Sequence, residues 1–131
     1  DTTGMANPIQ VGRVISVLVE GGVPLERIAV HFHDTRGTAL VNAYAAWQHG
    51  VRSFDGSVAG LGGCPYAPGA AGNAATEDLV YLFEEMGVAT GVNLEALSEA
   101  GAQMATVLGR ALPGRVHQYS LASAARQVRS A

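Results

Sequence analysis

The apolar residues of this sequence change their spacing repeatedly, from a helical period to an extended one and back. Asn7 followed by Pro8 is typical of a helix start, and Gly21-Gly22 of a helix end. In chain order, the pattern predicts a helix beginning at Pro8, a short buried strand over 27–32, a helix over 38–49 and a second strand over 51–54. Strands that alternate with helices predict parallel β/α units joined by right-handed crossovers.

The second half of the chain combines an irregular loop with further helices. Residues 56–72 are rich in Gly and Pro, whereas 74–86 and 94–112 have helical spacing, and the tail from Ser120 has only weak helical character. Two strands leave open sheet edges, and a (β/α)₈ barrel usually needs about 250 residues. The chain of 131 residues is therefore expected to be one piece of a larger compact architecture.

Composition argues against two classes of partner. The net charge is −3, so no basic surface for nucleic acid is expected. The longest uncharged stretch, Gly56 to Ala75, is too rich in Gly and Pro to cross a membrane. The chain starts at Asp1 without a targeting peptide, so we expect its start to be an internal boundary. A single Cys, eight Arg, no Lys and abundant Ala predict a protein of the bacterial cytoplasm.

Two histidines stand at the end of the first predicted strand, in the stretch His31-Phe32-His33-Asp34-Thr35. Residues two apart on a strand point to the same face, so two imidazoles lie side by side where the strand meets its loop. Neutral imidazole is a common metal ligand. The alternative is one core histidine and one surface histidine, and the spacing alone does not separate the two interpretations.

The loop from Gly60 to Gly69 contains four glycines, two prolines and the only cysteine, Cys64. Such a loop needs special backbone angles, so no helix or strand packs Cys64 away. The thiol either falls in the loop by chance or lies on a mobile flap that closes over a substrate. Asn73 has two interpretations as well: it caps the helix that follows, or its amide oxygen reaches a metal at the strand end.

The remaining polar and aromatic side chains are expected to have ordinary structural roles. Tyr44 and Trp47 lie on one helix face and are predicted to pack between helix and sheet. His49 precedes a glycine stop, which predicts a solvated helix end. His117 is predicted to lie on the surface of the tail.

Taken together, these stretches resemble one known family. Residues 31–35 (HFHDT), followed by Gly37, Ala39, Leu40 and Asn42, resemble the metal-binding strand of the 3-hydroxy-3-methylglutaryl-CoA lyase family. Residues 57–69 (SVAGLGGCPYAPG), with Gly72-Asn73 and the run 76–81 (TEDLVY), resemble its signature flap and the following helix. The resemblance runs from Asp1 to about Leu112.

The resemblance implies the C-terminal part of a (β/α)₈ TIM barrel over about 1–92, with a C-terminal helical segment over about 93–131, in one partial domain. It also implies a divalent cation, Mg²⁺ or Mn²⁺, and the following roles. The metal ligands are His31, His33 and Asn73; the catalytic residues are Cys64, His31 and Asp1; and the residues at the substrate are Thr2, Gly62 and Gly63. The family's first-strand Arg-Asp pair has no counterpart in this sequence.

The activity implied is cleavage of 3-hydroxy-3-methylglutaryl-CoA to acetyl-CoA and acetoacetate, in leucine degradation, by a homodimer. Three alternatives stay open. They are a lyase for a longer-branched 3-hydroxyacyl-CoA, a related metal-dependent aldolase or condensing enzyme, and an inactive fragment that lacks the first-strand residues.

Overall fold

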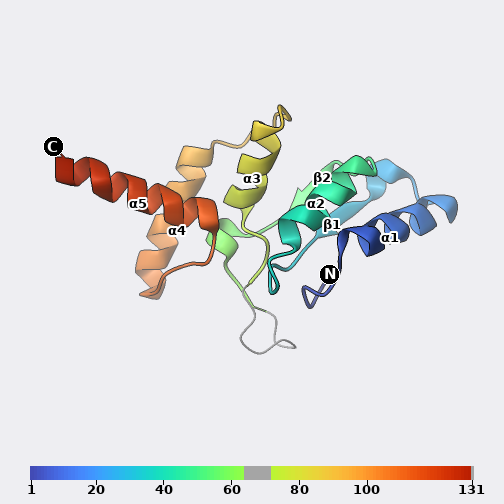
Figure 1. Ribbon diagram of the computed structural model, residues 1–131, viewed down its shortest axis with the longest axis horizontal. Coiled ribbons are helices and arrows are strands. Elements are labelled where there is room, and N and C mark those ends of the chain that lie inside the picture. Colours follow the sequence, from blue (N-terminus) through green and yellow to red (C-terminus); the bar gives the residue numbers. More distant parts are fainter. Residues whose placement is uncertain (64–71, 131) are drawn as a thin grey trace. The chain divides into compact units, whose positions relative to one another are not determined.

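The computed structural model describes residues 1–63 and 72–130 (Figure 1). In chain order, the elements are α1 (Pro8–Glu20), η1 (Leu25–Arg27), β1 (Ala29–His31), α2 (Ala39–Gln48), β2 (Ser53–Asp55), η2 (Val58–Gly60), α3 (Thr76–Glu85), α4 (Leu94–Leu108) and α5 (Arg115–Ser130). They fall into two compact units. The first contains residues 1–56 and 62–74, and the second contains residues 57–61 and the chain from 75 onward.

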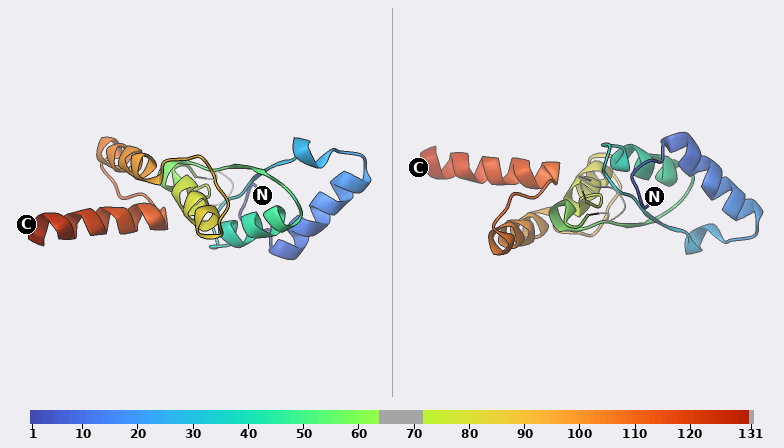
Figure 2. Two further views of the ribbon diagram at one scale, coloured as in Figure 1. Left: turned by 90° about the horizontal axis from the view of Figure 1, so that it is seen from above. Right: turned by 90° about the horizontal axis from the view of Figure 1, so that it is seen from below.

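Helix α1 begins and ends where the sequence predicts. The side chain of Asn7 accepts a hydrogen bond from the backbone of Gln10, and the side chain of Gln10 accepts one from Asn7, which makes a capping box before Pro8. Its buried residues, Val11 and Ile15, are four apart on one face. This helix packs against α2, and the two lie side by side in the views of Figure 2.

Strands β1 and β2 form a parallel sheet, in which Ala29 pairs with Ser53, Val30 with Phe54 and His31 with Asp55. Two parallel strands connected by a helix confirm the predicted β/α order. The buried strand predicted over 27–32 is confirmed only at Ile28 and Phe32, because Ala29 and His31 are exposed and Val30 is half-buried. The sheet has two strands in the part of the chain that the structure describes, so each strand keeps an open edge.

Helix α2 is buried through its small residues, and this corrects the prediction for its aromatic side chains. Ala39, Ala43 and Ala46 are at most 1% exposed, and the side chain of Asn42 donates a hydrogen bond of 3.0 Å to the carbonyl of Ala6. Alanines let the helix approach its neighbours closely. Of the two aromatic side chains, Tyr44 is 39% exposed and Trp47 is half-buried, and their rings stack with centroids 6.0 Å apart.

The second unit contains η2, α3, α4 and α5, and the last two differ from the prediction. Helix α4 ends at Leu108 rather than at 112, because Gly109 takes a left-handed conformation with φ of 62° and stops it. The tail is a regular helix, α5, which packs against α3 and α4. The carboxylate of Asp78 accepts the backbone N–H groups of Arg115 and Val116 at 3.1 and 2.7 Å and so fixes the start of α5.

His117 lies on the packed side of α5 and is fully buried, so its predicted surface position is wrong. A sequence with weak helical spacing gave no sign of this packed face. None of the helices in residues 1–63 and 72–130 has the length and apolar character that crossing a bilayer requires.

Candidate metal centre

The two imidazoles at the end of β1 and just beyond it, those of His31 and His33, lie next to each other. The ring centroids of His31 and His33 are 5.1 Å apart, and the ring planes meet at 68°. His33 is buried at 8% exposure, whereas His31 is more accessible. Burial lowers the pKa of His33 below its ordinary value of 6.5, and the nearby His31 lowers this pKa further. His33 is therefore a neutral imidazole at pH 7, the form that binds metal ions.

A short antiparallel contact brings Asn73 to these histidines. The backbone of Ala74 donates to the carbonyl of Phe32 at 2.9 Å, and Asp34 donates to the carbonyl of Gly72 at 3.2 Å. Between these two bonds, His33 and Asn73 face each other as a bridge pair. Asn73 is not a helix cap, because α3 begins three residues later, at Thr76, with Ala75 at its cap position. The helix-cap interpretation of Asn73 is therefore wrong.

The imidazole of His31 is held from both ring nitrogens. Its Nε2 lies 3.0 Å from Oδ1 of Asn73, and its Nδ1 forms a hydrogen bond with Oδ1 of Asp55. Asp55 was not among the predicted site residues. A sequence signal for it existed, since His31 and Asp55 end two neighbouring parallel strands, and such ends meet at the same sheet edge.

The polarity of these contacts points to a positive charge beside Asn73. A carboxylate only accepts hydrogen bonds, so Nδ1 of His31 donates its proton to Asp55. In a neutral imidazole, Nε2 then carries a lone pair, which faces the acceptor Oδ1 of Asn73. Two acceptors 3.0 Å apart need a proton or a cation between them. The same spacing separates adjacent donors around an octahedral cation with bonds of about 2.1 Å.

His31, His33 and Asn73 are hereafter called the imidazole–amide cluster. Its donors fit a divalent cation in part. The Nδ1 atom of His33 is buried and has no hydrogen-bond partner, as expected of an atom that needs a further ligand. Two nitrogens and one amide oxygen leave several coordination positions for water or substrate. Within the described ranges, no three His, Cys, Asp or Glu side chains are grouped to hold a metal.

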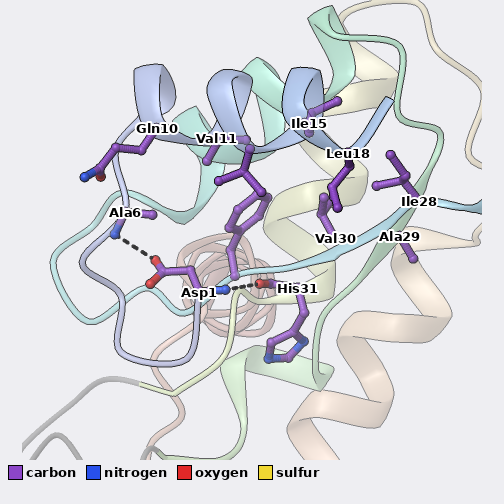
Figure 3. A pocket seen from close by; sticks show the side chains of 12 residues that line it. Asp1, Ala6, Gln10, Val11, Ile15, Leu18, Ile28, Ala29, Val30 and His31 are labelled. Atoms are coloured by element: carbon purple, nitrogen blue, oxygen red, sulfur yellow. Dashed lines mark hydrogen bonds between the residues drawn. The ribbon is translucent and has the colours of Figure 1, made fainter. Parts of the chain in front are cut away.

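Asp1 and Thr2 lie on the loop before α1. The carboxylate of Asp1 accepts the backbone N–H groups of Met5 and Ala6 at 3.1 and 3.2 Å, and its backbone nitrogen donates to the carbonyl of His31 at 3.0 Å (Figure 3). Asp1 also lines a cavity of about 310 Å³ between α1 and β1. The imidazole of His31 points to the other side of the strand from this cavity (Figure 3). Thr2 is exposed, and its predicted contact with substrate stays a prediction.

The glycine-rich loop reaches the cluster through Gly62. Gly62 has a φ of +106°, and a β-carbon added to it would lie 2.8 Å from Nδ2 of Asn73. Gly63 is exposed, and a β-carbon there would meet nothing within 4 Å. Cys64 lies outside the described residues, so its predicted position on a flap stays a prediction.

The base of this loop in the second unit is held by a carboxylate that the sequence did not single out. Ala59 is a non-glycine residue with φ of +51°, and its N–H donates to both oxygens of Glu77 at 2.9 and 2.7 Å. The N–H of Gly114 donates to the carbonyl of Ala59 at 2.9 Å. Burial raises the pKa of Glu77, although the N–H groups of Glu77 and Ala59 and the nearby His117 oppose this rise.

Comparison with known proteins gives one consistent family. The family model described as HMGL-like matches residues 1–104. The hydroxymethylglutaryl-CoA lyase YngG of Bacillus subtilis is 54% identical over 115 residues, which are 88% of this chain and 38% of that protein. The 3-hydroxy-3-isohexenylglutaryl-CoA/hydroxy-methylglutaryl-CoA lyase of Pseudomonas aeruginosa is 48% identical over 124 residues, which are 95% of this chain and 41% of that protein.

A solved structure agrees with these relatives. The HMG-CoA lyase of Acinetobacter baumannii, in complex with coenzyme A and 3-methylmalate, superposes with a TM-score of 0.84 at 46% identity. The match covers 90% of this chain and 38% of that one. The chain thus spans about two fifths of the length of the relatives that it matches.

Proposed function

We propose, because the chain belongs to the HMGL-like family, that it carries part of the active site of a metal-dependent carbon–carbon lyase. The reaction is cleavage of 3-hydroxy-3-methylglutaryl-CoA to acetyl-CoA and acetoacetate. The observation that carries this proposal is the 3.0 Å distance between Nε2 of His31 and Oδ1 of Asn73. Both atoms are able to bind a metal ion, and their residues are 42 positions apart in the sequence. The protein belongs to the α/β class, and the (β/α)₈ barrel is proposed for the longer protein.

His31, His33 and Asn73 would hold the divalent cation, Mg²⁺ or Mn²⁺. When bound, such a cation polarises a substrate oxygen and lowers the pKa of a hydroxyl group, which a tertiary alcohol needs before it can lose its proton. Oxygen donors favour Mg²⁺ and Mn²⁺ over softer ions, so substrate oxygens and a carboxylate from outside these residues would complete the site.

The protein residues have separate tasks in this scheme. A base removes the hydroxyl proton, the bond between the second and third carbons breaks, and the third carbon becomes the ketone of acetoacetate. The second carbon is left in a thioester enolate, which takes up a proton to give acetyl-CoA. The two predicted bases are His31 and Asp1; both ring nitrogens of His31 are engaged by Asp55 and Asn73, and the carboxylate of Asp1 accepts two backbone N–H groups. Cys64, Thr2, Gly62 and Gly63 remain proposed substrate-side residues.

The proposal is tested in the longer protein that contains this chain, by removing the metal and adding it back. The rate of 3-hydroxy-3-methylglutaryl-CoA cleavage should vanish in EDTA and return with Mn²⁺. His31→Ala should lower the rate by at least about 100-fold, since even loss of outer-shell partners costs about 10–100-fold. Glu20→Gln is the control, because Glu20 is an exposed carboxylate at the end of α1 and does not belong to the imidazole–amide cluster. Full activity of His31→Ala, or activity in EDTA, would overturn the proposal.

A longer-branched 3-hydroxyacyl-CoA is the second candidate substrate. It is supported by the relative from Pseudomonas aeruginosa, whose name joins 3-hydroxy-3-isohexenylglutaryl-CoA to the methyl substrate. The acyl branch has to be accommodated by pocket walls, so the ratio of kcat/KM for the two substrates separates the candidates. If kcat/KM is higher for the isohexenyl substrate, that substrate replaces the methyl substrate in this proposal.

The partners proposed for the whole protein are an acyl-CoA and a second copy of the protein, in the bacterial cytoplasm. The coenzyme A complex of the relative from Acinetobacter baumannii supports the acyl-CoA. The opposing candidate is an inactive fragment, because the chain spans two fifths of its relatives. Assay of the 131-residue chain alone, beside the protein that contains it, separates an incomplete active site from a complete one.

A further inference from the structure

Asp55 is the polar partner of the imidazole–amide cluster to which neither the sequence nor the comparisons give a role. It is the last residue of β2, in register with His31, and its carboxylate accepts the hydrogen bond from Nδ1 of the imidazole. Its side chain is 69% exposed, and His31 is its only partner among the hydrogen bonds found for the described residues. In that part of the chain, the carboxylate of Asp55 therefore makes no other side-chain hydrogen bond.

A neutral imidazole has two tautomers, and only one of them serves a cation beside Asn73. With the proton on Nδ1, the lone pair of Nε2 points at Asn73 Oδ1, 3.0 Å away. With the proton on Nε2, the same nitrogen would donate to the amide oxygen and could not bind a metal. The hydrogen bond to Asp55 selects the first tautomer, because a carboxylate accepts and does not donate.

We infer that Asp55 is a positioning residue that keeps the proton of His31 on Nδ1 and aims Nε2 at a divalent cation. This inference rests on the cation site of the proposed function. A carboxylate behind a ligating histidine fixes the orientation of the ring and raises its basicity. It also separates the roles of the two predicted bases: His31 is held as a ligand, and the proton of the substrate has to go to another group.

The tautomer can be read directly, without turnover. In protein labelled with ¹⁵N-histidine and free of metal, a two-bond ¹H–¹⁵N correlation spectrum identifies the protonated ring nitrogen of His31. We expect the proton on Nδ1 in the wild-type protein. Asp55→Ala should move it to Nε2, whereas Asp55→Asn keeps an acceptor oxygen and should retain the Nδ1 proton. Glu20→Gln, which removes a distant charge, should leave the spectrum of His31 unchanged.

Binding of Mn²⁺, followed by electron paramagnetic resonance, gives the second readout. Asp55→Ala should raise the Kd by about 10–100-fold, and Asp55→Asn should recover part of that loss. A wild-type proton on Nε2, or an Asp55→Ala variant with unchanged tautomer and unchanged Kd, would overturn the inference. A wild-type protein with the proton on Nδ1 that binds no Mn²⁺ overturns the proposed cation site but supports control of the tautomer by Asp55.

Discussion

A β-carbon at Gly62 would lie 2.8 Å from Nδ2 of Asn73, so the glycine leaves no room for a side chain beside the amide of the imidazole–amide cluster. The atom that such a carbon meets is the far end of a flexible side chain, which can turn away at little cost in stability. That same turn would separate Asn73 from His31. The contact therefore predicts an effect on binding that is larger than its effect on folding.

Gly62→Ala should raise the Kd for Mn²⁺ by about tenfold or more, at the lower end of losses from outer-shell changes. Gly37→Ala is a matched control, because Gly37 also has a positive φ, +73°, but has open space at its β-carbon. Both variants should lose about 1–2 kcal/mol of unfolding free energy from the left-handed backbone, and only Gly62→Ala should lose affinity. Calorimetric titration and urea unfolding measure the two quantities. Equal affinities for the two variants would remove Gly62 from the site.

His33→Phe should change stability and metal binding in opposite directions. Nδ1 of His33 is buried without a partner, and an unsatisfied buried polar atom costs about 1–3 kcal/mol. Replacement by an apolar ring should therefore leave the unfolding free energy of the metal-free protein unchanged or raise it. Mn²⁺ affinity should fall, because one imidazole is lost.

The control for His33→Phe is Ile15→Val, at a core position with 4% exposure. This change should cost about 0.5–1.5 kcal/mol of stability and leave the Kd for Mn²⁺ unchanged. A His33→Phe protein that loses stability as an ordinary core variant does, with its metal affinity intact, would show that His33 is a packing residue.

The unfolding free energy of the Glu77→Gln variant, relative to that of the wild-type protein, should increase as the pH rises. Burial raises the pKa of Glu77 above its ordinary value of 4.5, so its protonated form is favoured in the folded state. The stability that this provides is fully present below pH 4.5 and is lost as the pH rises through the raised pKa. Gln resembles the protonated carboxyl at every pH. Urea unfolding from pH 4 to pH 7 should show the variant gaining on the wild-type protein; a difference that is constant with pH would contradict the raised pKa.

Gly101→Ala should destabilise the second unit, although alanine is the better helix former by about 1 kcal/mol. Its β-carbon would lie 2.7 Å from Nδ1 of His117 and 3.1 Å from Oε1 of Glu77, both fully buried. Overpacking of this kind costs about 1–3 kcal/mol. In a His117→Ala background, the cost should disappear, and a double-mutant cycle measured by thermal unfolding tests this coupling.

The sequence predicted what depends on short-range contacts. The helix start at Asn7-Pro8 and the alternation of helices with strands follow from residues only a few positions apart. The two-residue period of a strand also predicted that His31 and His33 share one face, but it did not decide whether they form one site. These features need no information about distant parts of the chain.

Only the tertiary structure decided which distant groups meet. Asn73 reaches His31 because backbone bonds join residues 32–34 to 72–74, and Asp55 reaches it because two strands end in register. The buried position of His117 likewise depends on how α5 packs. The spacing of Asn73 fits a helix cap and a metal ligand equally well, since local pattern does not specify the long-range pairing. Backbone hydrogen bonds on both sides of Asn73 fix its register against residues 32–34. This register decides that Asn73 lies beside His31 and does not cap a helix.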